Sequence, residues 1–316
     1  LSGMDNSGLF ARFFEDLRLP YVTWFVDDPR TIIMDRPIYA SPFAIALTWE
    51  ASYQPYLTSV GFSESRVLPL AAEISLFDAG PAETCAFPPT FIGNSMTEFS
   101  RDEWTWITAY PDLAQALTRA FETDRVTRDR FARGLDAILG DELVAALDPD
   151  QKRHAEMYCF IEGTRRLRVQ LMRQLEPEGV LVRGDDAWRG YLAACGPYVG
   201  YRGELPAYYR DCEINLNSTS LQMASAVNQR VFDCPAAGGF LLTDAQPSLE
   251  TLFEPQTEIA QYHSPEECRD LIRFYRAHPH LRNEIAANAR RRILAHHSYA
   301  NRLRELGAIV KNRYGE

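Results

Sequence analysis

Apolar and polar positions alternate near the start of the chain in a way that predicts helices and strands in turn. Apolar residues at helical spacing over 9–17 predict a helix, and the β-rich run 21–26 predicts a strand. We expect a second strand over 43–48, a helix over 50–60 and a third strand over 67–71. This order predicts a parallel sheet covered by helices.

A long helical segment follows, and then the alternation returns. The run 90–92 predicts a strand that ends at a turn, and residues 101–174 show apolar stripes at helical spacing without a strand signal. Ser264, followed by Pro265 and Glu267, is typical of a helix amino terminus. Between 174 and 264 we expect strands over 180–182, 198–201, 214–216 and 240–242, and helices over 188–194, 205–210 and 226–232.

The proline-containing stretch that ends at Pro88-Pro89 separates two α/β units. We therefore expect an amino-terminal domain over 1–87 and a carboxyl-terminal domain over 88–316, each a Rossmann-like unit with a parallel sheet. The helical segment lies between strands of the second domain. The sequence leaves open whether this segment packs as core, covers a cleft or forms the contact surface of a homo-oligomer.

Composition narrows the classes of partner. The 43 acidic and 33 basic residues give a net charge of -10, which disfavours binding to nucleic acid or to an anionic membrane surface. No apolar run approaches the ~20 residues of a membrane-spanning helix. The six cysteines are widely spaced and form no CxxC pair, so we expect reduced thiols and a cytoplasmic protein.

Polar loops follow the expected strands of the second domain at their carboxyl ends. In an open parallel sheet these ends share one edge, where ligands bind. The loop residues are Arg183, Gly184, Tyr201, Arg202, Asn217 and Ser218, with Gly93 and Asn94 as candidates for a phosphate-binding loop.

The helix expected after the third of these loops begins with side chains that suit a diphosphate and a ribose. A diphosphate needs backbone N–H groups at a turn or a helix amino terminus, and a guanidinium to balance its charge. Asn228, Gln229 and Arg230 supply such groups. Asp233 lies one turn beyond Arg230, and its carboxylate can accept two hydrogen bonds from a ribose diol. These four residues complete the predicted donor site.

Several of these motifs together resemble the spore maturation protein-like group of glycosyltransferases, and more broadly the carboxyl domain of group 1 glycosyltransferases. The residues that carry the resemblance are Gly184-Asp185, Tyr201-Arg202-Gly203, Asn215-Leu216-Asn217 and the runs 226–233 and 236–244. The run 24–29 resembles the amino-terminal module associated with the group, and His297-Ser298-Tyr299 with Arg302 resembles its final helix.

The resemblance implies a GT-B enzyme that transfers a sugar from a nucleoside diphosphate sugar, without a metal ion or other cofactor. The acceptor would be a hydroxyl of a glycan, a lipid-linked glycan or a protein. The resemblance also implies that Asp233 binds the ribose as the second member of a glutamate pair, although Ser225 stands at the first position. Because a GT-B amino domain usually begins with a strand and a glycine-bearing loop, we expect this domain to be incomplete, with the last helix packing on it.

Asp27 and Asp28 follow the first expected strand and are the candidates for a catalytic base. Transfer with inversion needs a general base within hydrogen-bond reach of the acceptor hydroxyl. The alternative is that Asp28-Pro29 forms a turn and a cap. Two other functions also stay open: a nucleotide-sugar epimerase of the same fold, and a non-catalytic protein that binds sugar nucleotides or serves in assembly.

Overall fold

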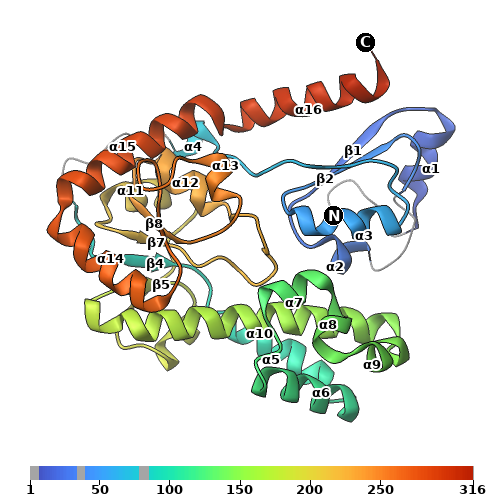
Figure 1. Ribbon diagram of the computed structural model, residues 1–316, viewed down its shortest axis with the longest axis horizontal. Helices are drawn as coiled ribbons and strands as arrows, with labels where there is room; N and C mark the ends of the chain where they lie inside the picture. Colours follow the sequence, from blue (N-terminus) through green and yellow to red (C-terminus); the bar gives the residue numbers. More distant parts are fainter. Residues whose placement is uncertain (1–6, 34–39, 78–84, 316) are drawn as a thin grey trace.

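The computed structural model describes residues 7–33, 40–77 and 85–315. Its strands form two parallel sheets (Figure 1). The smaller sheet has the order β1-β2-β3 and consists of β1 (Tyr21–Phe25), β2 (Ala44–Thr48) and β3 (Ser65–Val67). The larger sheet has the order β6-β5-β4-β7-β8-β9 and consists of β4 (Thr90–Ile92), β5 (Leu181–Arg183), β6 (Cys195–Gly196), β7 (Asn215–Leu216), β8 (Leu241–Asp244) and β9 (Ala260–Tyr262).

Helices accompany both sheets and fill the segment between β4 and β5. With the first sheet come α1 (Leu9–Asp16), α2 (Pro29–Ile33), the 3-10 helix η2 (Ala51–Tyr53), α3 (Gln54–Ser59) and α4 (Ile74–Phe77). The helical segment consists of α5 (Thr97–Ile107), α6 (Pro111–Glu122), α7 (Arg128–Arg133), α8 (Leu135–Leu139), α9 (Asp141–Ala146) and α10 (Pro149–Leu175). The remainder contains η3 (Glu176–Glu178), η4 (Asp186–Gly190), α11 (Leu205–Asp211), α12 (Arg230–Ala236), α13 (Leu249–Leu252), α14 (Pro265–Ala277), α15 (Pro279–His296) and α16 (Tyr299–Tyr314).

The two faces of the smaller sheet are buried by parts of the chain that lie far apart in sequence. Ala44 and Ala46 of β2 face a cluster that includes residues of α2 and α3. Ile45 and Leu47 point the other way, because side chains alternate along a strand, and they pack against Leu306 of α16. Figure 1 shows α16 reaching from the carboxyl-terminal part across β1 and β2. The last helix therefore completes the core of the first sheet.

The larger sheet is covered by helices on both faces, as expected of a Rossmann-like unit. Phe91 of β4 and Leu242 of β8 pack on the face that α10 and α14 cover. Their neighbours Ile92 in β4 and Leu241 in β8 pack on the opposite face, which α12 covers. The strand order runs outward from β4 in one direction and from β7 in the other. The direction of the strand order thus reverses between β4 and β7, and this is the place where such folds bind ligands.

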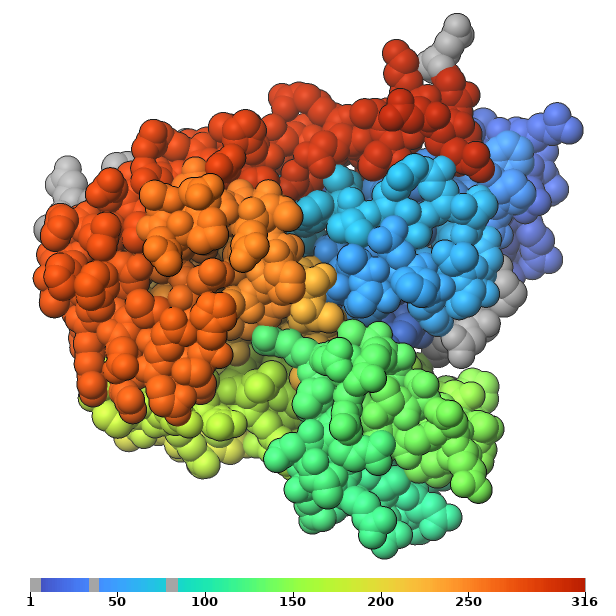
Figure 2. Space-filling model, viewed as in Figure 1, coloured from blue at the N-terminus to red at the C-terminus, as the bar shows by residue number. Residues whose placement is uncertain are grey.

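The helical segment confirms the prediction made for 101–174 and has a core of its own. Ile107, Leu117, Phe131 and Ile138 are buried in that core. The long helix α10 also joins the larger sheet through Met172 and its neighbours. In Figure 2 this segment, in green, meets the amino-terminal part in blue and the carboxyl-terminal part in yellow and orange. The helical segment, the amino-terminal part and the carboxyl-terminal part therefore contact one another.

Several elements differ from the predictions. The strand expected over 67–71 lies at Ser65–Val67, because the chain leaves the sheet at Pro69, which lacks an N–H. The strand expected over 198–201 lies at Cys195–Gly196, before Pro197, and the helix expected over 188–194 is the shorter 3-10 helix Asp186–Gly190. The helix expected over 226–232 is α12, which begins only at Arg230, and β9 was not predicted.

Candidate functional site

Arg230, at the start of α12, bridges the two strands at the point where the strand order reverses. Its guanidinium donates to the backbone oxygen of Ile92 at the end of β4, and to Oδ1 of Asn217, just after β7, at 2.7 Å. The guanidinium also lies over the Phe91 ring, 5.1 Å from its centre. Arg230 therefore holds the ends of β4 and β7 together, and most of its donors are already engaged by the protein.

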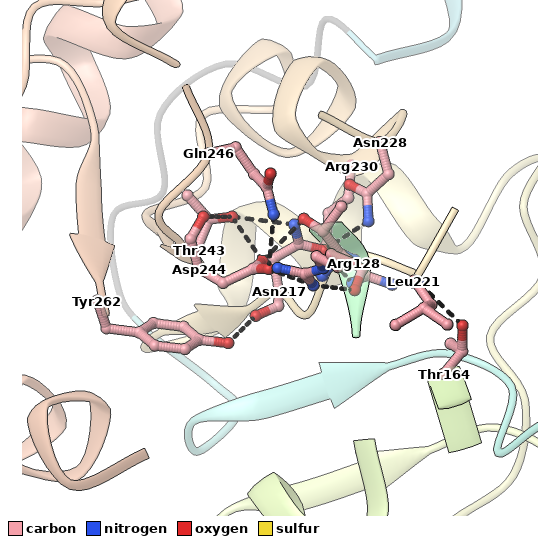
Figure 3. A network of polar contacts seen from close by, with 11 residues as sticks. Arg128, Thr164, Asn217, Leu221, Asn228, Arg230, Thr243, Asp244, Gln246 and Tyr262 are labelled. Atoms are coloured by element: carbon pink, nitrogen blue, oxygen red, sulfur yellow. Dashed lines mark hydrogen bonds and ion pairs between the residues drawn. The ribbon is translucent and has the colours of Figure 1, made fainter. Parts of the chain in front are cut away.

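Asn217 is the centre of the polar network shown in Figure 3 and is fully buried. Its Nδ2 donates to Oγ1 of Thr243 at 3.0 Å, and its Oδ1 accepts from Nδ2 of Asn228 at 2.9 Å. The hydroxyl of Tyr262 donates to the backbone oxygen of Asn217 at 2.6 Å. The structure thus brings together three of the predicted donor-site residues, Asn217, Asn228 and Arg230.

Arg128 extends this network to the helical segment. From α7 it donates to Oδ2 of Asp244 at 2.8 Å. The other carboxylate oxygen of Asp244 accepts from the backbone N–H of Thr219 at 2.9 Å and from its hydroxyl at 2.8 Å. The helical segment is therefore tied to the carboxyl end of β8, and Arg128 belongs to the candidate site although the sequence analysis missed it.

Arg168, on α10, adds a third guanidinium to the same edge of the sheet. Its Nη1 donates to the backbone oxygen of Asn94 at 2.8 Å. The pKa of Arg168 is lowered to about 10, chiefly by burial and in smaller part by the positive charges of Arg230 and Arg128. In the described part of the chain, Nε of Arg168, Nε of Arg128 and Oδ1 of Asn228 are buried without a hydrogen-bond partner. The cluster combines excess positive charge with unused donors, which suits an anion.

The turn after β4 packs tightly against the turn after β5. The N–H of Gly93 donates to the backbone oxygen of Arg183 at 2.9 Å. A Cβ atom on Gly184 would collide with the backbone oxygen of Gly93 and press on Trp188. Asn94 is exposed, and its side chain accepts from the N–H of Met96 at 2.6 Å. The close approach of the two backbones explains why position 184 is a glycine. Gly93 and Asn94 lie beside the arginine cluster.

Asp233 forms a second group with Tyr201 and Gln229. Its carboxylate is 1% exposed and accepts from the Tyr201 hydroxyl at 2.9 Å and from Nε2 of Gln229 at 2.8 Å. Burial raises the pKa of Asp233 to about 7, against the lowering effect of these two hydrogen bonds and of Arg230. Gln229 also donates to the backbone oxygen of Ala71 at 2.7 Å. Asp233 therefore lies near the contact between the start of α12 and the amino-terminal part of the chain.

The remaining predicted donor residues lie outside these groups. Arg183 donates through Nε to the backbone oxygen of Pro197 at 2.9 Å and stacks over Tyr208. Arg202 is exposed, whereas Ser218 is buried beside Asn217. The structure assigns Arg183 a role in holding the end of β6.

The two candidate bases have different surroundings. Asp28 is 3% exposed and is held by Arg30, with 2.6 Å between Oδ2 and Nη2 and 3.0 Å between Oδ1 and Nε. Arg30 also donates to the backbone oxygen of Phe131 in α7 at 3.0 Å, which places the end of β1 against the helical segment. Asp27 is exposed; partial desolvation raises its pKa, and the neighbouring Asp28 raises it further.

The thiols and the helices add further observations. All six cysteines are free. Within 7–33, 40–77 and 85–315, no helix is long and apolar enough to span a membrane. Over the same residues, no group of three or more His, Cys, Asp or Glu is arranged to hold a metal ion.

Comparisons with solved structures establish the class of fold. Over 96% of this chain, sucrose-phosphate synthase from Thermosynechococcus elongatus aligns with a TM-score of 0.53 and 11% identity, covering 71% of that chain. HepE from Anabaena, solved in complex with UDP-glucose, aligns over 96% of this chain and 76% of its own with a TM-score of 0.56 and 11% identity. A glycosyltransferase from Rickettsia africae covers 98% of this chain and 80% of its own, with a TM-score of 0.52 and 10% identity. The chain has the GT-B fold.

A protein-family model matches most of the second half of the chain. Residues 165–308, somewhat less than half of the chain, match a family described as glycosyl transferase-like. No curated protein matches the chain. The family match and the fold support a relationship to group 1 glycosyltransferases. The finer resemblance to the spore maturation protein-like group and to its amino-terminal module stays a prediction.

Proposed function

We propose that the chain is a glycosyltransferase that moves a sugar from a nucleoside diphosphate sugar to a hydroxyl group of a glycan, a lipid-linked glycan or a protein. The observation that carries this proposal is the cluster of Arg128, Arg168 and Arg230 where the strand order reverses. The buried Nε donors of Arg128 and Arg168 lack partners among the described residues, and a diphosphate carries anionic oxygens that suit them.

In the proposed reaction the acceptor oxygen attacks the anomeric carbon of the donor. The bond between that carbon and the diphosphate oxygen breaks, and the nucleoside diphosphate leaves with the bonding electrons. We propose that Arg168 and Arg128, rather than a metal ion, balance the charge that develops on the leaving group, because preorganised cations stabilise it without rearranging.

We propose Asp27 rather than Asp28 as the base that takes the acceptor proton. Both oxygens of Asp28 are already bound by Arg30, so this carboxylate is poorly placed to accept a proton. Asp27 is exposed, and its raised pKa brings it closer to the range in which general bases work. Asp27→Asn should therefore abolish transfer while leaving donor binding intact.

Asp233 remains the proposed ribose ligand. Because the Tyr201 hydroxyl occupies one of its carboxylate oxygens, ribose binding requires Tyr201 to move or to share that oxygen. The proposal therefore includes a rearrangement of the exposed Tyr201 side chain as the donor enters.

The test is a panel of nucleoside diphosphate sugars assayed for binding, hydrolysis and transfer. UDP-glucose comes first, because HepE was solved with it. Arg168→Ala should weaken donor binding by about tenfold or more, the loss expected for a hydrogen bond to a charged group. Arg173→Ala is the matched control, because Arg173 lies on the same helix but is exposed. Absence of binding by every donor at millimolar concentration would overturn the proposal.

A further inference from the structure

Glu50 is a buried carboxylate that reaches from the amino-terminal part to the carboxyl-terminal part. It follows β2 and is 0% exposed. Its oxygens accept from the backbone N–H of Ser225 at 2.8 Å, from the Ser225 hydroxyl at 2.7 Å and from the N–H of Ala226 at 2.8 Å. The N–H of Ser52, in its own domain, donates at 3.0 Å. None of the ion pairs in the described residues includes Glu50, so backbone and hydroxyl donors hold the carboxylate.

These hydrogen bonds favour the charged form of the side chain. Burial by itself raises the pKa of Glu50, but the hydrogen bonds from Ser225, Ala226 and Ser52 outweigh it and leave the pKa below its usual value. A carboxylate that accepts several N–H bonds stays ionised even when it is shielded from water. The contact is therefore a charged one, and it joins two domains.

The partner of Glu50 is the segment over residues 217–229, which we name the donor loop. It begins with Asn217 and Ser218, ends with Asn228 and Gln229, and contains neither helix nor strand. A segment without its own hydrogen-bond ladder takes its shape from outside contacts. The shape of the donor loop is therefore decided by what surrounds it.

Other contacts hold the donor loop from different sides. The hydroxyl of Tyr53, from the amino-terminal part, donates to the backbone oxygen of Gln222 at 2.7 Å. The N–H of Leu221 donates to Oγ1 of Thr164 on α10 at 3.0 Å. Glu50 differs from these single bonds, because one side chain satisfies three donors of the loop.

We propose that Glu50 is a positioning residue of the acceptor-side domain that holds the donor loop in its ligand-binding shape. Without its carboxylate, the N–H groups of Ser225 and Ala226 lose their acceptor just before Asn228 and Gln229. The donor site is then complete only when the amino-terminal part is docked against it. The predicted effect of Glu50 on donor binding rests on the proposed function. The predicted effect of Glu50 on the shape of the donor loop does not.

The first measurement is amide hydrogen exchange of the protein without any ligand, comparing the wild type with Glu50→Gln. Exchange over 217–229 should become about tenfold faster or more in the variant, because exchange follows local opening and a charge-assisted bond contributes at least that factor. Peptides from α14, far from the contact, should not change. Unchanged exchange over 217–229 would overturn the proposal, whatever the protein is found to bind.

Glu73→Gln is the matched control. Glu73 also accepts from a serine N–H, at 3.2 Å, and from the hydroxyl of the same Ser75, at 2.7 Å, but within a single exposed segment. It should leave the donor loop unaffected. Ser225→Ala removes one of the four hydrogen bonds of Glu50 and should give a smaller increase in the same direction, which covers the case in which Glu50→Gln folds poorly.

The second measurement uses UDP-glucose, or whichever nucleoside diphosphate sugar the wild type binds. Glu50→Gln should raise the KM for the donor about tenfold and change kcat much less, because the residue does not touch the reacting atoms. A fall in kcat with unchanged donor KM would contradict a positioning role. If the wild type binds no donor, the proposed function fails, and the exchange measurement still decides the role of Glu50.

Discussion

The buried carboxyl of Asp233 makes a prediction about stability that can be worked out in detail. The side chain is 1% exposed, and burial raises its pKa from 3.8 to about 7. Replacing it with asparagine gives a side chain of the same shape that stays neutral at every pH. The variant Asp233→Asn therefore resembles the wild type at low pH and differs from it once the aspartate ionises.

Whether the free energy of unfolding rises or falls with pH depends on which state, folded or unfolded, releases the proton at the lower pH. Above pH 3.8 the unfolded chain ionises Asp233, whereas the folded chain keeps the proton up to about pH 7, so the free energy of unfolding falls as pH rises. The shift of about 3 pKa units corresponds to roughly 4 kcal/mol in total. Between pH 5 and pH 8 the remaining loss is roughly 3 kcal/mol.

The assay is urea unfolding of the wild type and of Asp233→Asn at pH 5, 6, 7 and 8. The difference between the two proteins removes the contribution of every other titrating group. We expect the variant to gain roughly 3 kcal/mol relative to the wild type between pH 5 and pH 8. Asp186→Asn is the control, because the Asp186 side chain is 96% exposed.

One outcome would refute this reasoning. If the difference between wild type and Asp233→Asn stayed constant from pH 5 to pH 8, Asp233 would be ionised throughout that range in both the folded and the unfolded chain. The hydrogen bonds from Tyr201 and Gln229 would then outweigh the burial of the carboxyl group.

Three further predictions concern stability. Burial lowers the pKa of His297 to about 4, so between pH 6.5 and pH 4 this residue should lower the free energy of unfolding of the wild type by about 3 kcal/mol. In urea unfolding the variant His297→Gln should lose less over the same range, and an equal loss would contradict this. Gly184→Ala should lower the melting temperature by overpacking worth about 1–3 kcal/mol, whereas Gly190→Ala, with open space around it, should not. Leu306→Asp should cost about 2 kcal/mol or more in calorimetry, and Leu303→Asp, 64% exposed on the same helix, close to nothing.

Elements with strong local signals were predicted well from the sequence. The helix that begins after Ser264 is confirmed, with the serine side chain accepting from the N–H of Glu267 at 3.1 Å. The strands β1 and β2 fall within their predicted runs: β1 is rich in β-branched and aromatic residues, and β2 is a short run of buried, mostly apolar residues. The helical segment was recognised because apolar spacing at the helical period is a property of the segment itself.

Elements shaped by distant contacts were not predicted. The start of α12 moves from 226 to Arg230, and the residues before it lie in an irregular loop that Glu50 holds through Ser225 and Ala226. Similarly, Arg128 and Arg168 join Arg230 only through the packing of the helical segment on the sheet. The local sequence pattern does not indicate contacts between residues that lie far apart in the chain. The residues next to Arg128 and Arg168 in the sequence do not distinguish these two arginines from others.

The position of α16 has a consequence for the order in which the protein is made. Ile45 and Leu47 leave the ribosome well before Leu306, which packs against them and is synthesised about 260 residues later. At 5–20 residues per second, the roughly 260 residues between them take on the order of 10–50 s. During that interval the face of the first sheet that carries Ile45 and Leu47 lacks the cover that α16 gives it in the folded protein.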